Sequence, residues 1–138
     1  VVLTAFIPML MDTGGNSGSQ ASVTIIRGLS LNEIKFRDLP RVLWKEMRVA
    51  LLCGITLAAA NFCKLMWFDR VGVWVSLVVS LTLIVTVFFA KIVGSALPIL
   101  SKKIGFDPAV MASPFITTIV DAISLIIYFQ IASLLLGL

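Results

Sequence analysis

The sequence predicts an all-α integral membrane protein, a polytopic helical bundle formed by one chain of 138 residues. Hydrophobic residues make up 59% of the chain and charged residues only 13%, about half the charge of an average soluble domain. Mean hydropathy is +1.09, and three apolar stretches reach the ~20 residues that a helix needs to cross a bilayer. No polar linker separates two cores, so we expect residues 1–138 to form a single transmembrane domain.

The pattern of charges and the residue types exclude several classes of protein. The formal net charge is +4, but most cations lie in two short connections, 27–48 and 101–103, where they indicate membrane orientation and not a nucleic-acid partner. The chain has no histidine and only Cys53 and Cys63, which excludes a His/Cys site for zinc or copper. No Ser-His, Cys-His or paired-carboxylate arrangement indicates an enzyme.

The first element, residues 1–27, is predicted to be a helix that is broken near its middle, in the stretch 11–20. Three glycines, an acid, two amides and three hydroxyls interrupt the apolar run there. Irregular backbone at membrane depth is tolerated only where it is buried in protein or lines a water-filled cavity, so we interpret the stretch as the wall of a polar path. Close helix packing is the alternative, since Gly14 and Gly18 form a small-xxx-small pattern. Packing explains the glycines but not the acid and the amides.

Two more membrane helices are predicted after a basic connection. Residues 30–48 are expected to form a cytoplasmic amphipathic connector, because loops rich in Lys and Arg face the cytoplasm. Helices are then expected over 49–68 and 71–100, and the second is long enough to require a tilt or a kink at its glycine and proline. Lys91 within it is expected to extend toward the membrane interface, with a cavity-facing position as the alternative.

The last helix, 108–138, is predicted to carry a polar stripe with an acid at its centre. Five polar side chains recur at spacings of 4, 4, 3 and 4 residues: Ser113, Thr117, Asp121, Ser124 and Tyr128. These spacings place them on one helical face. A carboxylate at the centre of a bilayer costs about 2.5 to 3.5 kcal/mol, so Asp121 is a functional-site candidate, with an ion pair to Lys91 as the structural alternative. Asp107 is either the helix N-cap or a second cation site.

The polar groups of the two stretches are carboxylate, amide, hydroxyl and backbone carbonyl, which are hard oxygen ligands. Such ligands suit magnesium, calcium or manganese. One acid per chain at mid-membrane is too little charge for a bare divalent ion, whereas two chains that meet on a twofold axis supply two. Magnesium gives up its water reluctantly. We therefore expect a homodimer with the pore at or near its twofold axis. The pore is expected to hold the ion through the water molecules bound to the ion.

Two segments resemble signatures of the MgtE family of magnesium channels. Residues 8–20 (PMLMDTGGNSGSQ) and 24–28 (TIIRG) are similar to the family's second helix, and 107–121, which begins DPAV and ends TTIVD, resembles its last helix. The resemblance implies a homodimeric, multi-pass inner-membrane channel with five transmembrane helices per subunit that binds and conducts Mg²⁺. It also implies a preceding first helix and cytoplasmic N and CBS domains that sense magnesium, which these residues do not include.

The resemblance also assigns roles to single residues. Asp121 matches the pore acid that recognises hydrated magnesium, and Asp107 matches an acid at the cytoplasmic end that binds a further magnesium ion. The pore wall that the resemblance implies comprises Gly14, Gly15, Asn16, Gly18, Ser19 and Thr117. The polar pattern adds four residues to this expected pore lining: Asp12, Gln20, Ser113 and Ser124.

Two other functions compete with a magnesium channel. A coupled secondary transporter of another small ion would also use a glycine-rich membrane helix, although Asp121 repels anions. A non-conducting subunit of a membrane assembly would use the small residues for packing alone. Ion flux through the protein in liposomes separates these functions.

Overall fold

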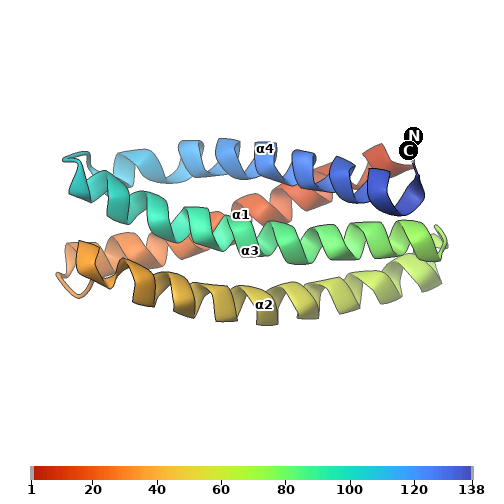
Figure 1. The fold of residues 1–138 in the computed structure, drawn as a ribbon, viewed down its shortest axis with the longest axis horizontal. Helices are drawn as coiled ribbons and strands as arrows, with labels where there is room; N and C mark the ends of the chain where they lie inside the picture. Colours follow the sequence, from red (N-terminus) through yellow and green to blue (C-terminus); the bar gives the residue numbers. More distant parts are fainter. Residues whose placement is uncertain (1, 138) are drawn as a thin grey trace.

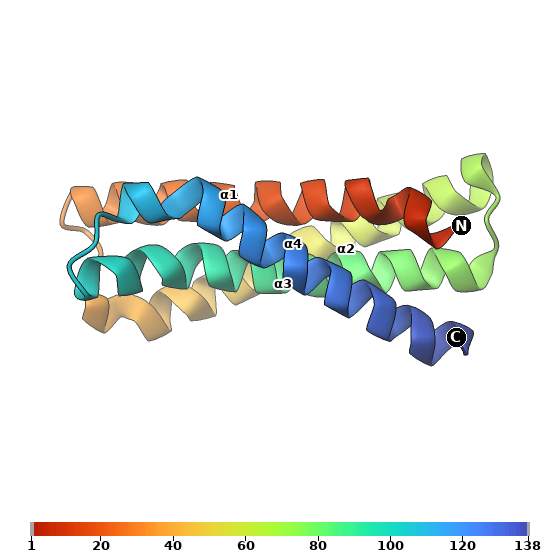
Figure 2. The ribbon, with the colours of Figure 1, turned by 90° about the horizontal axis from the view of Figure 1, so that it is seen from above.

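The computed structural model describes residues 2–137, apart from the side chains of residues 111–113. In this part of the chain every regular element is helical. Four long helices run side by side, α1 (Ile7–Ser30), α2 (Leu39–Lys64), α3 (Val73–Lys103) and α4 (Pro108–Leu136), as Figures 1 and 2 show. Three short helical turns accompany them: η1 (Leu3–Phe6), η2 (Phe36–Asp38) and η3 (Leu65–Asp69).

The helix boundaries follow from proline and glycine. Pro8, Pro40 and Pro108 each stand in the first two positions of a long helix, where the missing N–H has no intrahelical partner to lose. Gly72 before α3 and Gly105 after it have φ angles of 93° and 92°, a region that other residues avoid. The tight connections at the two ends of α3 therefore depend on these glycines.

α3 is the central helix of the bundle. It packs against α1, α2 and α4, and α1 also packs against α4. Within the described residues, three helical stretches are long and apolar enough to span a membrane: Phe36–Asp69, Val73–Lys103 and Pro114–Leu136. The glycines and polar side chains of α1 exclude it from that set. The expected all-α membrane fold is thus confirmed, and the chain is a multi-pass membrane protein.

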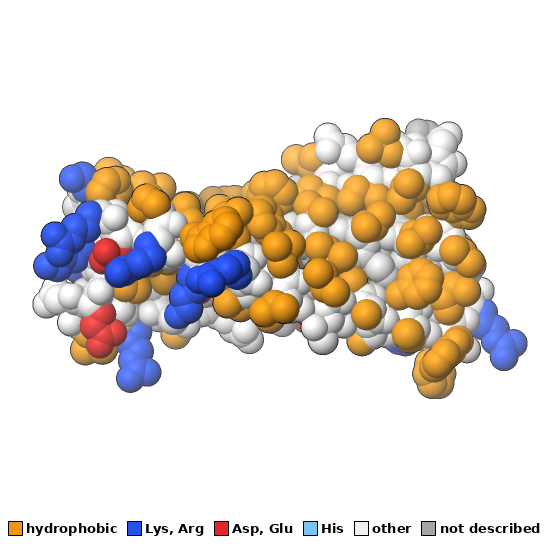
Figure 3. Space-filling view, turned by 60° about the horizontal axis from the view of Figure 1, so that its bottom comes forward, with side chains coloured by type: hydrophobic (Ala, Val, Ile, Leu, Met, Phe, Trp, Pro, Cys, Tyr) orange, Lys and Arg blue, Asp and Glu red, His pale blue; other side chains and the backbone are white. Residues whose placement is uncertain are grey.

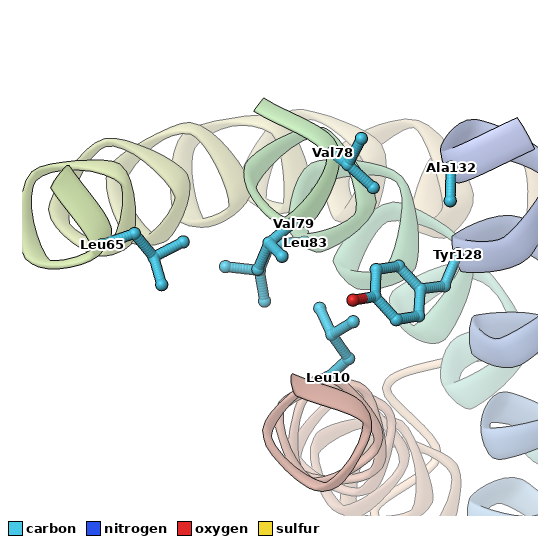
Figure 4. Close-up of a cluster of buried hydrophobic side chains, with 7 residues drawn as sticks. All are labelled: Leu10, Leu65, Val78, Val79, Leu83, Tyr128 and Ala132. Atoms are coloured by element: carbon cyan, nitrogen blue, oxygen red, sulfur yellow. The ribbon is translucent and has the colours of Figure 1, made fainter. Parts of the chain in front are cut away.

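A hydrophobic cluster joins α1, α3, α4 and η3 near the end that carries both chain termini (Figure 4). Leu10 of α1, Val79 of α3 and Tyr128 of α4 are almost fully buried in it, beside Leu65 of η3. The Tyr128 hydroxyl donates a hydrogen bond of 2.6 Å to the Leu3 carbonyl. This bond gives the one polar atom of the tyrosine a partner inside an apolar region.

The predicted break in the first helix is wrong: α1 is continuous from Ile7 to Ser30. Its glycines serve close contact instead. A Cβ atom on Gly14 would lie 2.7 Å from Cγ2 of Thr86, and one on Gly18 would lie 2.9 Å from Cγ2 of Ile116. A Cβ on Gly94 of α3 would strike the Gly18 carbonyl oxygen. The small-xxx-small pattern therefore brings α1 against α3 and α4 without interrupting the helix.

The basic segments meet at one end of the bundle. The α1–α2 and α3–α4 connections both lie at the end opposite the chain termini (Figure 1). Figure 3 shows Lys and Arg side chains gathered there, beside a broad apolar surface. The expected separate connector over 30–48 differs from the structure, because α2 begins at Leu39 and continues without interruption past Val49. The cationic side chains of that region therefore belong largely to a membrane helix.

Candidate cation site

A groove of about 430 Å³ lies between the middle parts of α1 and α4 and opens to the outside of the chain. Two carboxylates, an amide and two hydroxyls contribute to its wall. The residues that line it are Met11, Asp12, Gly15, Asn16, Ser19, Thr117 and Asp121. The structure thus brings together six residues of the predicted site, from segments about 100 positions apart in the sequence.

Helical spacing explains how these side chains meet. On α1, Asp12, Asn16 and Ser19 are four and three residues apart and share one face. On α4, Thr117 and Asp121 are four residues apart and face them. Gly15 is buried between the two helices, and a Cβ there would meet only Cγ2 of Thr117, at 3.6 Å. The absence of a side chain at Gly15 keeps the floor of the groove open.

The two carboxylates of the groove differ in their partners. Asp12 accepts a hydrogen bond of 3.2 Å from the Asn16 side-chain amide. Asp121 has neither a hydrogen bond nor an ion pair with any described residue. The alternative in which Lys91 pairs with Asp121 is wrong, because the ammonium of Lys91 lies 3.9 Å from the carboxylate of Glu46 instead. Asp121 is therefore available to a cation in the groove.

The Glu46–Lys91 pair was not predicted from the sequence. Both residues are more than nine-tenths buried, at 9% and 8% exposure, and they join α2 to α3. The expectation that Lys91 extends toward the interface is therefore wrong, since a buried carboxylate compensates its charge. The two residues are 45 positions apart, and no local pattern relates them.

Several predicted pore residues lie outside the groove. Gly14 and Gly18 are buried in the contacts of α1 with α3 and α4. Ser124 is buried and its hydroxyl donates to the Val120 carbonyl at 2.7 Å. Gln20 is exposed on α1 but does not line the groove, and the Ser113 side chain lies outside the described residues.

The polar stripe of α4 lies in two different environments, the groove and the packed interior, and the path of the helix explains why. Its residues share one broad face, but that face meets different neighbours along the helix. Thr117 and Asp121 face the groove, whereas Ser124 and Tyr128 are buried against the bundle. α4 crosses over α1 and α3 (Figure 2), so one helical face passes from the groove into the packed interior.

Asp107 acts as the N-cap of α4. Its Oδ1 atom accepts a hydrogen bond of 3.0 Å from the Ala109 backbone N–H, as a capping aspartate does. It lies at the basic end of the bundle and does not line the groove around Asp121. The structure therefore separates the two acids that the sequence singled out as candidate metal ligands.

The groove offers too few ligands to enclose a bare ion. Among the described residues, no group of three or more His, Cys, Asp or Glu side chains is placed to hold a metal. Two carboxylates with neutral oxygens around them suit a cation that keeps its water shell. A slightly larger depression, of about 470 Å³, lies beside Phe129 and Leu134, but its lining contains no charged side chain.

Comparisons with known proteins agree with the membrane fold and the polar groove. The MgtE family, described as divalent cation transporters, matches residues 7–131. The chain is 41% identical over 134 residues to the magnesium transporter MgtE of Thermus thermophilus, which covers 97% of this chain and 29% of that protein. It is 34% identical to the magnesium transporter MgtE of Enterococcus faecalis and 32% identical to that of Bacillus subtilis, each over 96% of this chain and 29% of the relative. The chain spans less than a third of the length of these relatives. The match over most of the chain means that it belongs to the MgtE family of divalent cation transporters.

Proposed function

We propose that this chain is the pore-forming part of a magnesium channel, in which Asp121 carboxylates from two subunits recognise hydrated Mg²⁺. The observation that carries the proposal is the groove itself. A carboxylate without a partner in the described residues lies near the middle of a membrane helix, among the amide and hydroxyls of a polar surface. A charge in that position is expensive unless an ion or water compensates it.

A hydrated ion fits this groove better than a bare one. Asp12 and Asp121 are two acids of one groove, fewer than the oxygens that a dehydrated divalent ion requires. Asn16, Ser19 and Thr117 supply amide and hydroxyl oxygens that can accept hydrogen bonds from water bound to the ion. Magnesium is the divalent ion that holds its water most firmly among those considered.

The open side of the groove supports a second copy of the chain as its other wall. The groove is bounded by α1 and α4 and opens away from the bundle. A twofold axis near Asp121 would place two such acids on opposite sides of one ion, and their charge would match that of Mg²⁺. The relatives are named magnesium transporters, which favours the same cargo here. Asp107, exposed at the basic end, is proposed as a further Mg²⁺ contact at the mouth of the path.

Flux measurements on the full-length protein in liposomes test the proposal. Replacing Asp121→Asn removes a charge worth roughly 2 to 3 kcal/mol to a nearby cation at an effective dielectric constant of about 20. We expect Mg²⁺ flux at limiting concentration to fall on the order of 100-fold. Glu33→Gln, which removes an exposed acid outside the groove, serves as the matched control and should conduct like the parent.

The same measurement separates the competing functions. If the protein were a carrier of small anions, the Asp121→Asn variant would keep its affinity for the substrate. If it were a non-conducting subunit of a membrane assembly, the parent protein itself would show no ion flux. If Asp121→Asn conducts Mg²⁺ as well as Glu33→Gln does, the role proposed for Asp121 is wrong.

A further inference from the structure

A second pocket, of about 210 Å³, lies at the basic end of the bundle, far from the groove. It is formed where the connection after α1 meets the C-terminal turn of α3. Its polar wall consists of Lys35, Lys102, Lys103 and Asn32. The proposed pore does not use this pocket, although Leu29 and Ile99 at its base also pack α1 against α3.

The pocket concentrates positive charge without a compensating acid. No Asp or Glu lines it, and its three lysines form no ion pair with any described residue. Asp38, an acid of the adjoining turn η2, is already engaged. It accepts a hydrogen bond of 3.0 Å from the Lys35 backbone N–H and pairs with Arg41 at 3.2 Å. No acid among the described residues therefore neutralises the three ammonium groups.

Two of the lysines are held in place by neutral groups. The ammonium of Lys102 donates a hydrogen bond of 3.1 Å to the Leu29 carbonyl in the last turn of α1, a position that the helix dipole favours for a cation. The ammonium of Lys103 lies 4.9 Å from the centre of the Phe36 ring, which is a cation–π contact. Each ammonium keeps further N–H donors for a ligand.

The remaining surface of the pocket is apolar and lies where the membrane helices end. Leu29, Ile34, Phe36 and Ile99 complete the lining. Large apolar side chains next to it, Leu31, Ile104 and Phe106, are more than half exposed. A pocket that combines basic head groups with exposed apolar side chains at the end of a membrane span has the composition of a site at the lipid–water interface.

We propose that this pocket binds a phosphate group at the membrane surface, supplied by the head group of an anionic phospholipid. The lysines would contact the phosphate oxygens, and the apolar side would contact the glycerol backbone and the start of the acyl chains. A soluble phosphate would use the same lysines but would gain nothing from the apolar half of the pocket. Basic pockets at the cytoplasmic ends of membrane helices are typical sites for lipid head groups.

Native mass spectrometry of the full-length protein in detergent tests the proposal. Phosphatidylglycerol, phosphatidylcholine and inorganic phosphate are titrated separately, and phosphate is also added as a competitor. The pocket variant is Lys35→Gln, Lys102→Gln and Lys103→Gln together. The matched control is Arg37→Gln, Lys45→Gln and Arg48→Gln, which removes the same charge near the same end from residues that do not line the pocket. Thermal unfolding of both variants checks that the fold is retained.

We expect phosphatidylglycerol to bind the parent protein more tightly than phosphatidylcholine. Each direct lysine–phosphate hydrogen bond contributes about a 5-fold gain, so the pocket variant should bind phosphatidylglycerol on the order of 100-fold more weakly, while the control keeps most of the affinity. Equal losses in both variants would mean diffuse surface attraction and would overturn the proposal. Displacement of phosphatidylglycerol by inorganic phosphate at equal concentration would overturn the lipid as the source of the phosphate.

Discussion

Glu46 on α2 and Asp121 on α4 are carboxylates of two membrane helices with contrasting surroundings. Glu46 is enclosed between α2 and α3, with the ammonium of Lys91 at 3.9 Å. Asp121 lies in a groove that opens to the outside of the chain, with no charged partner among the described residues. The charge of Glu46 is compensated within the chain, whereas no described residue compensates the charge of Asp121.

The difference between these two regions shows how to separate structural acids from functional ones in a membrane. Both residues are carboxylates within membrane helices, so residue type and position in the sequence do not distinguish them. The partner does: a buried charge that its own chain neutralises contributes to the packing of helices, whereas a charge that no neighbour neutralises is placed for an ion, water or a second subunit. The predictions below test that distinction.

The largest effect on stability is expected at the buried Glu46–Lys91 pair. Lys91→Met leaves the Glu46 carboxylate buried without a counter-charge, which should lower the free energy of unfolding by about 3 to 5 kcal/mol. The denaturant midpoint of the protein in detergent measures this loss. Adding Glu46→Leu to Lys91→Met should recover most of it, because two apolar side chains then replace two charges.

For Asp121→Asn, the denaturant midpoint is expected to show no loss of stability, in contrast to Lys91→Met. Its unfolding midpoint should equal that of the parent or rise slightly, because a carboxylate without a partner costs free energy at membrane depth. A loss of stability as large as that of Lys91→Met would show that Asp121 has a structural role after all. The comparison between the two acids would then fail.

A smaller effect is expected from adding one methyl group to a tight or an open helix contact. Gly94→Ala would push a Cβ against the Gly18 backbone carbonyl, which cannot move aside as a side chain could, so the cost should be about 1 to 3 kcal/mol. Gly15→Ala would meet only Cγ2 of Thr117 at an ordinary contact distance, and alanine favours helix. Its midpoint should therefore stay the same or rise. Equal destabilisation by both variants would contradict the difference between a packed contact and an open groove.

The smallest effect is expected from the second acid of the groove. Asp12 is exposed and bonded to Asn16, so water screens its charge more than that of Asp121. Asp12→Asn should lower Mg²⁺ flux about 5-fold, in line with roughly 1 kcal/mol for a partly screened charge. Gln20→Ala, on the same helix but outside the groove, is the control. A similar loss in Gln20→Ala would mean that the wall of the path extends beyond the groove.

Much of this arrangement could be predicted from the sequence. Apolar length predicts membrane helices over 49–68, 71–100 and 108–138, and the structure has helices in all three ranges, although α2 begins earlier, at Leu39, and α3 extends to Lys103. Helical spacing and polarity also singled out Asp12 and Asp121, which the structure places in one groove. These features depend on local composition and on a fixed period of 3.6 residues, so a single sequence is enough to find them.

The features that could not be predicted depend on distant neighbours. Gly14 and Gly18 have the same spacing whether a helix breaks or packs closely, and only the presence of α3 and α4 decides between the two. Ser124 and Asp121 share one helical face, but the crossing of α4 over the bundle buries one and leaves the other in the groove. The partner of Lys91 is on another helix, and no sequence period indicates it.

The continuity of α1 through its glycines has a consequence for ion selection. In an unbroken helix each backbone carbonyl is engaged by the N–H four residues further along, so the groove presents side-chain oxygens and not a ring of backbone oxygens sized to a bare ion. Discrimination at such a site depends on the total charge of the ion and on how firmly it holds its hydration shell, and little on its ionic radius. Under the proposed function, divalent ions that enter fully hydrated should therefore compete closely at this position, and finer selection among them would have to arise elsewhere in the protein.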